Sequence, residues 1–140
     1  MLDRSLIHKF EGHKAAVTSV DISNDSHFIV SGSKDGTVKI WDITKCKIIR
    51  TLSNHSRPVN CVAFSPNGKY IISGGDDNLV NLYNASSGKL IRSFRKHNSP
   101  VRAVAFSTDN TYFASAGNEK NILLWEKTHD KLVREYPGHG

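Results

Sequence analysis

Histidine, serine and acidic residues recur in this sequence in a combination that could support nucleophilic catalysis. A histidine that bridges a carboxylate and a serine can take the hydroxyl proton and activate the serine oxygen. Three such sets follow one another at a constant interval of 42 residues: His13, Ser31 and Asp35, then His55, Ser73 and Asp77, then His97, Ser115 and Glu119. A reaction centre is not expected to recur three times with variations. We therefore predict a structural role for these residues, with no catalytic residue and no enzymatic activity.

The histidines do not follow a metal-binding pattern either. His13, His55, His97 and His139 occur once per repeat, so they are expected on separate structural units and not around one ion. The remaining histidines have no partner at ligand spacing. The pair Gly74-Gly75 lacks the lysine and the following helix of a phosphate-binding loop. We therefore predict no metal and no other cofactor.

Apolar residues divide each 42-residue repeat into four short strands. The first strand alternates, as in Val20 and Ile22, and the second is nearly continuous, as in Phe28-Ile29-Val30. Continuous apolar character indicates an inner strand buried on both faces. Asp35-Gly36 favours a tight hairpin before the third strand, because a two-residue turn needs positive φ. No segment has an apolar stripe of helical period, so the fold class is predicted to be all-β.

Gly12-His13 opens the first repeat and Trp41-Asp42 ends its third strand, a pairing that resembles the WD40 repeat family. Two further copies run from Asn54-His55 to Tyr83-Asn84 and from Lys96-His97 to Trp125-Glu126, so the resemblance covers essentially the whole chain. It implies a β-propeller with three four-stranded antiparallel blades. The chain then divides into an N-terminal outer, closure-type strand with its loop (residues 1–12), three repeats (13–54, 55–96 and 97–138) and the start of a truncated fourth (139–140).

The resemblance also implies a hydrogen-bond network inside each blade. A buried polar group without a partner costs about 1–3 kcal/mol, so the members of a buried network have to satisfy one another. The expected members are His13, Ser31, Asp35 and Trp41, then His55, Ser73, Asp77 and Tyr83, and finally His97, Ser115, Glu119 and Trp125. Tyr83 replaces a tryptophan and Glu119 an aspartate, which predicts looser second and third blades.

Members of this family commonly bind partners on the face formed by the loops before the first strand and between the second and third strands. Carried over to this chain, the candidate partner-binding residues are Lys14, Thr18, Lys34, Arg57, Asn60, Asp76, Asn98, Arg102 and Asn118. The leading interpretation is a non-catalytic scaffold that mediates protein–protein interactions within a multiprotein complex. Its expected partners are other proteins or peptides.

Positive charge is concentrated in the middle of the chain. Residues 43–108 carry ten Lys and Arg against two Asp and Glu, within a net charge of +6. This stretch favours an acidic partner, and the alternative is a module associated with nucleic acid or a ribonucleoprotein. No apolar run reaches the roughly 18 residues of a membrane span, so no membrane partner is predicted. Two cysteines without CxxC spacing fit an intracellular protein of the cytoplasm, the nucleus or both.

Three blades do not close a ring, because propellers typically have about 4–8 blades. The terminal blades would expose apolar faces, which favour association. Two interpretations follow: further blades complete a larger propeller, or copies of the chain self-associate. In both cases we expect the chain on its own to be oligomeric or poorly soluble.

Overall fold

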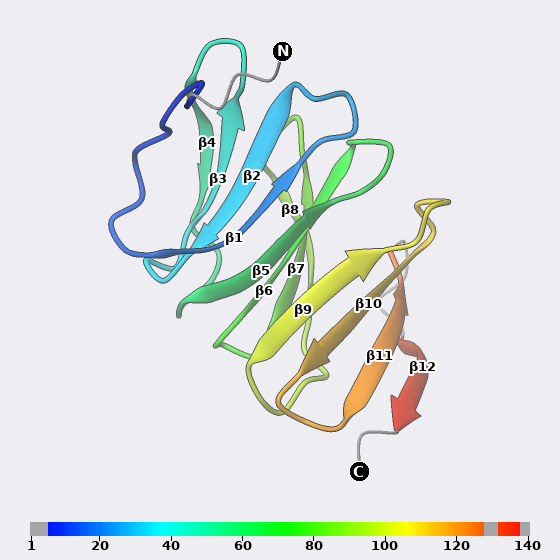
Figure 1. Cartoon of the computed structure of the whole chain (residues 1–140). Coiled ribbons are helices and arrows are strands. Elements are labelled where there is room, and N and C mark those ends of the chain that lie inside the picture. Colours follow the sequence, from blue (N-terminus) through cyan, green and yellow to red (C-terminus); the bar gives the residue numbers. More distant parts are fainter. Residues whose placement is uncertain (1–5, 128–131, 138–140) are drawn as a thin grey trace.

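The computed structural model describes residues 6–127 and 132–137. Within these ranges, twelve strands form three four-stranded antiparallel sheets and no segment is helical. The described part of the chain therefore has no helix that could cross a membrane. Figure 1 shows the three sheets as successive blades, with strands β1, β5 and β9 side by side. The predicted all-β class, with three antiparallel blades of an unclosed propeller, is confirmed.

Each blade is made of four strands that are consecutive in the sequence. The first contains β1 (Val17–Ile22), β2 (Phe28–Ser33), β3 (Val38–Asp42) and β4 (Lys47–Leu52). The second contains β5 (Val59–Phe64), β6 (Tyr70–Gly75), β7 (Val80–Asn84) and β8 (Leu90–Phe94). The third contains β9 (Val101–Phe106), β10 (Tyr112–Gly117), β11 (Asn121–Glu126) and β12 (Leu132–Pro137). Within each blade, each strand pairs with the next one in the chain.

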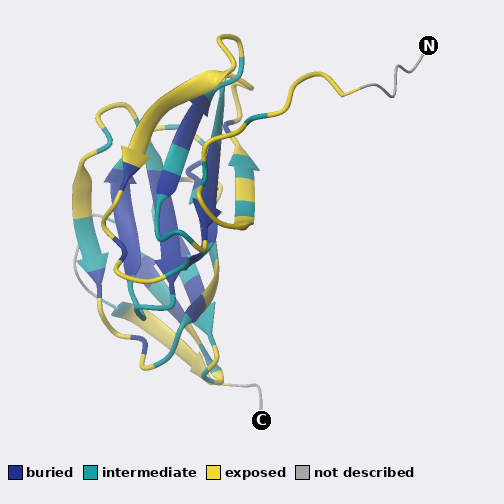
Figure 2. Ribbon diagram, turned by 90° about the vertical axis from the view of Figure 1, so that its left-hand side faces the viewer, coloured by how far each residue is buried: buried dark blue, intermediate teal, exposed yellow. Residues whose placement is uncertain are grey.

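Two apolar clusters hold the blades together, one at each interface. Val30 and Ile40 of the first blade pack with Val59 and Tyr83 of the second, and a corresponding cluster joins the second blade to the third. The blades approach so closely that a Cβ at Gly32 would lie 2.7 Å from Val59 Cγ1. Figure 2 shows the result, with the buried residues concentrated in the middle of the stack and exposed residues both on outer strands such as β4 and on the inner strand β1.

The second blade is the most enclosed of the three. In β6 and β7, Ile71, Val80 and Tyr83 are completely buried, because a neighbouring blade covers each face of the sheet. Tyr83 was the residue that predicted a looser second blade. The structure shows no such loosening at this position, because the phenol ring fills the space between the first two blades.

The N-terminal segment differs from the prediction. Residues 6–10 were expected to form an outer strand, but they form no strand in the structure. In a ring such a segment would complete the last blade, and here β12 already pairs with β11 of the third blade. Phe10 instead packs edge-to-face on Trp41, with 5.7 Å between the ring centroids. Residues 1–5 and the predicted start of a fourth repeat at 139–140 lie outside the described residues.

Apolar side chains remain exposed on the inner strand of the first blade, which leads us to expect self-association. On β1, Val20 is 64% and Ile22 is 55% exposed. Adjacent exposed apolar side chains favour contact with another apolar surface. Light scattering on the full chain should therefore give a mass above that of one copy, and replacing both residues with lysine should lower it. A soluble, monodisperse monomer of the unaltered chain would show this expectation to be wrong.

The two cysteines are both free thiols but differ in accessibility. Cys46 is exposed, whereas Cys61 is 7% exposed and its burial raises the pKa of the thiol to about 12. The thiolate is the species that reacts with alkylating agents. Iodoacetamide at neutral pH should therefore modify Cys46 and spare Cys61 until the chain is unfolded. Peptide mapping by mass spectrometry checks this, and equal labelling of both cysteines under native conditions would contradict it.

Candidate functional site

In the first blade, a line of hydrogen bonds leads from the loop before β1 to the tryptophan of β3. His13 Nδ1 donates to Asp35 Oδ2 at 3.0 Å, and Ser31 Oγ lies 2.6 Å from His13 Nε2. Trp41 Nε1 donates to the same serine oxygen at 2.8 Å. Since Ser31 Oγ accepts from the indole, its own proton is available to His13 Nε2. Asp35 also accepts from the backbone N–H of Lys14 at 2.9 Å, which ties the loop to the blade.

The second blade has the same line with a phenol at its end. His55 lies 2.9 Å from Asp77 Oδ2 through Nδ1 and 2.7 Å from Ser73 Oγ through Nε2. The hydroxyl of Tyr83 accepts from Asn81 Nδ2 at 3.2 Å. Burial raises the pKa of Tyr83, although hydrogen bonds with Ser73 and Asn81 oppose this effect. The Tyr83 hydroxyl thus finds partners of its own within the blade.

The third blade accommodates the longer acidic side chain. His97 is hydrogen-bonded through Nε2 to Ser115 Oγ at 2.7 Å, and Trp125 Nε1 donates to that oxygen at 2.9 Å. His97 Nδ1 is hydrogen-bonded to Glu119 Oε1. The second carboxylate oxygen of Glu119 accepts from Ser99 Oγ at 2.5 Å. The longer side chain of Glu119 therefore keeps its hydrogen bond with His97 and also accepts one from Ser99.

These sets contain the atoms of a catalytic triad, but a substrate cannot reach their serine oxygens. Ser31, Ser73 and Ser115 are 3%, 0% and 2% exposed, so no substrate carbonyl can approach their oxygens. In the first and third blades the serine oxygen is also engaged by the indole N–H. A nucleophile requires an open approach to the reacting atom. Among the described residues, no three His, Cys, Asp or Glu side chains are placed to hold a metal ion.

The network carboxylates make stability depend on pH. Burial on its own would raise the pKa of Asp77, but hydrogen bonding and the charge of His55, together with backbone N–H donors, hold it below its usual value. The pKa values of Asp35 and Glu119 are also lowered against burial, chiefly by the hydroxyl donors Thr37 and Ser99 and then by other hydrogen bonds, including those with His13 and His97. A carboxyl whose pKa is lower in the folded chain stabilises the fold above its unfolded pKa, near 4, and loses that contribution as the pH falls.

We therefore expect the free energy of unfolding to decrease as the pH is lowered from about 5 to about 2. Urea denaturation at a series of pH values measures this slope. An Asp77→Asn variant should be less stable at neutral pH and should show a shallower slope. An unchanged slope in that variant would contradict the role assigned to Asp77.

The nine residues expected to bind partners lie at one end of the blades, in or beside the loops before the first strand and between the second and third strands. They do not share one environment. Thr18 and Asn60 stand at irregularities in the pairing of β1 with β2 and of β5 with β6. A bulge of this kind turns a side chain out of the sheet. Thr18 Oγ1 donates to the carbonyl of Val59 at 2.5 Å, and Asn60 Nδ2 donates to that of Val101 at 2.9 Å. Each therefore fastens its blade to the next.

A second group forms an exposed polar cluster around Arg102. Its Nε donates to Asn118 Oδ1 at 3.1 Å, and a guanidinium nitrogen lies 4.0 Å from Asp76 Oδ1. Asp76 Oδ1 also accepts from Asn60 Nδ2 at 2.8 Å. The structure thus brings Asn60, Asp76, Arg102 and Asn118 together across the second and third blades.

The remaining candidates, Lys14, Lys34, Arg57 and Asn98, are exposed. Within the described part of the chain, the side chains of Lys14, Lys34 and Arg57 make no ion pair. The carboxylates of Asp35 and Asp77 contact His13 and His55 and form no ion pair with these cations. We call Lys14, Lys34 and Arg57 the loop-face cations.

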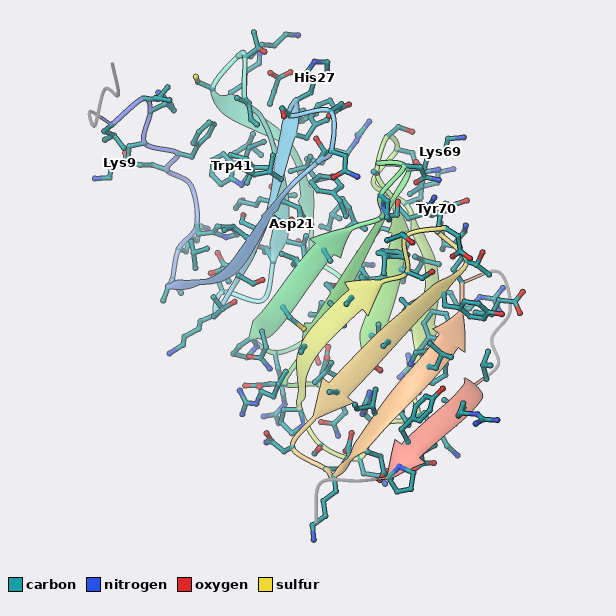
Figure 3. The ribbon with its side chains drawn as sticks, turned by 45° about the vertical axis from the view of Figure 1, so that its right-hand side comes forward. Lys9, Asp21, His27, Trp41, Lys69 and Tyr70 are labelled. Carbon is teal, nitrogen blue, oxygen red and sulfur yellow. The ribbon has the colours of Figure 1, made fainter. Side chains whose placement is uncertain are left out.

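Two polar residues of β1 that were not predicted as site residues contact the second blade. Ser19 Oγ accepts from the N–H of Val62 at 3.1 Å, and Asp21 Oδ2 accepts from that of Phe64 at 2.8 Å. Both fasten β1 to the edge of β5, and Figure 3 labels Asp21 on this strand. The alternation of β1 marks these polar positions, but the order of residues does not indicate that they meet the next blade.

Comparison with known proteins agrees with this geometry. The family model described as "WD domain, G-beta repeat" matches residues 4–42, 46–84 and 88–126. Forty-five residues are 51% identical to the kinesin-like protein klp-12 of Caenorhabditis elegans, covering 32% of this chain and 3% of that protein. Forty-four residues are 43% identical to the target of rapamycin complex subunit LST8 of Saccharomyces cerevisiae, covering 31% of this chain and 14% of that protein.

Two solved structures share the fold over most of the chain. The crystal structure of RRP9 WD40 repeats superimposes with a TM-score of 0.89 at 24% identity, over 93% of this chain and 41% of that one. The structure of U3-55K gives a TM-score of 0.90 at 24% identity, over 93% and 42%. The chain therefore spans less than half the length of each of these proteins. Because the family model matches three repeats across most of its residues, the chain belongs to the WD40 repeat family.

Proposed function

We propose that this chain is a non-catalytic scaffold that holds other proteins or peptides within a multiprotein complex, as part of a larger propeller. The absence of catalysis is proposed because each serine that could act as a nucleophile is buried beneath its histidine. The histidine, serine and acidic side chains of each repeat hydrogen-bond to one another and so stabilise the fold. Binding is left to the exposed loop ends.

The observation that carries the proposal is the set of loop-face cations. They stand at the ends of the first two blades, where the network carboxylates Asp35 and Asp77 contact His13 and His55. An exposed group of cations without intramolecular partners attracts negative charge. The fitting partner is thus an acidic segment of another protein. LST8, one of the similar proteins, is a subunit of the target of rapamycin complex, which supports this kind of role.

Reversal of these charges tests the proposal. The full chain, with an affinity tag, is used to retrieve proteins from nuclease-treated cell extract, and the retained proteins are quantified by mass spectrometry. A variant with Lys14→Glu, Lys34→Glu and Arg57→Glu should lose a defined set of proteins. A variant with Lys9→Glu, Lys45→Glu and Lys47→Glu makes the same change of charge at exposed positions away from the loop-face cations and should retain that set. Equal retention by both variants would contradict the proposal.

The alternative function is association with nucleic acid or a ribonucleoprotein, and the basic stretch of residues 43–108 favours it. The two functions differ in their response to salt and nuclease. Binding through phosphates releases counterions, so the logarithm of the affinity falls linearly with the logarithm of salt concentration. If nuclease treatment removes the retained proteins and the salt slope is steep, the alternative replaces the scaffold proposal.

A further inference from the structure

An apolar pocket opens between the first and second blades at the end opposite the loop-face cations. We call it the inter-blade pocket, and its volume is about 290 Å³. Its walls are formed by Phe28, Ile40, Ile49, Phe64, Gly68 and Ala85. Phe28 and Ala85 pack against the apolar cluster between these blades, so the base of the pocket adjoins the core.

The repeat itself shows why this pocket is open. At the interface of the second and third blades, Lys127 stands at the position that corresponds to Ala85, and Tyr70 at that of Phe28. The ammonium of Lys127 lies over the ring of Tyr70, 4.9 Å from its centroid, and donates to the carbonyl of Asn110 at 2.5 Å. A lysine of the chain therefore covers that ring. At the first interface the methyl of Ala85 leaves Phe28 uncovered.

Arg50 lines the inter-blade pocket, and Lys69 and Lys89 lie close in the chain to residues that line it. The guanidinium of Arg50 donates through Nε and Nη2 to the carbonyl of Ser86, at 3.1 and 2.9 Å, which holds it at the rim. Lys69 adjoins Gly68, and its carbonyl accepts from the N–H of Ala85 at 2.9 Å. Lys89 follows Gly88, where a Cβ would lie 2.6 Å from Arg50 Cδ. Figure 3 shows Lys69 at the same end of the blades as His27.

Three carboxylates at this end accept hydrogen bonds from groups close in the sequence. Asp25 accepts from Ser23 Oγ at 2.6 Å, and Asp109 accepts from Ser107 Oγ at 2.6 Å, each within its own turn. Asp42 accepts from the N–H of Lys45 at 2.8 Å. The pocket walls contain no acidic residue. Because the lining includes the guanidinium of Arg50 and no carboxylate, the opening favours a negatively charged ligand.

We propose that the inter-blade pocket binds one bulky apolar side chain of an acidic peptide segment, whose carboxylates pair with Arg50 and the lysines at the rim. The volume is at the lower limit of pockets that hold small molecules, about 300 Å³, and suits a single side chain such as phenylalanine. The uncovered ring of Phe28 receives the apolar group. Arg50 is anchored in advance by Ser86, so it presents its remaining N–H groups without a large ordering cost. This surface is separate from the loop-face cations.

Binding of a defined peptide to the full chain tests this site. The probe is acetyl-Glu-Asp-Glu-Phe-Glu-Asp-Glu-amide carrying a fluorophore, with affinity measured by fluorescence anisotropy. The variant Ala85→Lys places a lysine over Phe28, as Lys127 lies over Tyr70, and should weaken binding roughly tenfold or more, because phenylalanine burial is lost. The control Thr44→Lys adds the same charge on an exposed turn at this end and should leave affinity unchanged. Circular dichroism verifies that both variants are folded.

Changing the peptide and changing the charge of Arg50 test the site in two further, independent ways. Exchange of phenylalanine for alanine in the peptide should weaken binding to the unaltered chain by the same factor, with no added effect in Ala85→Lys. Arg50→Gln should weaken binding several-fold and reduce its salt dependence, whereas Arg57→Gln, on the loop face, should not. A peptide with benzoylphenylalanine in place of phenylalanine should crosslink to residues of the pocket, a readout that needs no variant to fold.

Four results would overturn the proposal. The first is unchanged affinity in a folded Ala85→Lys variant, and the second is crosslinking outside the pocket. The third is loss of binding with Arg57→Gln alone, which would place the peptide on the loop face. The fourth is an oligouridylate that binds in preference to the peptide and is insensitive to Ala85→Lys.

Discussion

Replacing Phe94 with alanine should lower the free energy of unfolding by about 3–5 kcal/mol. Phe94 is completely buried, and its ring lies 5.0 Å from that of Phe113 and 4.9 Å from that of Trp125, centroid to centroid. It ends β8 of the second blade, whereas both partners belong to the third. The substitution therefore leaves a cavity at an interface between blades. Urea denaturation followed by tryptophan fluorescence measures the loss.

The matched control is Ile91→Ala on the same strand. Ile91 is 44% exposed, so its truncation removes little buried surface and should cost below about 1 kcal/mol. Equal losses from the two variants would mean that β8 contributes through its backbone pairing and not through the Phe94 ring.

Replacing His55 with alanine should cost about 3 kcal/mol or more. The imidazole is 0% exposed and bridges Asp77 and Ser73 by hydrogen bonds. The side chain of Asp77 is 6% exposed. Its removal deprives a nearly buried carboxylate of its principal partner. The remaining donors to Asp77, such as the N–H of Ser56, do not replace the imidazole.

The matched control for this variant is His27→Ala. The side chain of His27 is 68% exposed and lies 3.6 Å from Asp25, so little stability should be lost. If His55→Ala were to unfold at the urea concentration of the unaltered chain, the histidine would not support the blade. The case for a structural, non-catalytic role would then lose its main support.

Periodicity made most of the fold accessible from sequence. An interval of 42 residues aligns histidine, serine and tryptophan or tyrosine in successive copies, and strand alternation places them on corresponding strands. In the structure the histidine and serine of each blade are within hydrogen-bond distance. Such spacing is informative because each copy is one structural unit that repeats the same contacts.

Contacts between blades were not accessible in this way. Thr18 and Asn60 were candidate partner-binding residues, yet each donates to a carbonyl of the next blade. Their orientation depends on strand irregularities and on the distance to a neighbouring sheet, and neither follows from the order of residues within a repeat. The inter-blade pocket depends likewise on an alanine at 85 opposite a phenylalanine from another repeat.

The apolar clusters join the first blade to the second and the second to the third, in a linear series. Such an array behaves like a one-dimensional chain of cooperative units, whose free energy is the sum of the terms for single units and nearest-neighbour couplings. The central unit has two couplings and each end unit has one, so opening begins at the ends and leaves β5–β8 until last. A ring would give every unit two couplings and remove the weak ends. Closure, whether by further blades or by another copy, would thus turn gradual fraying into a single all-or-none transition.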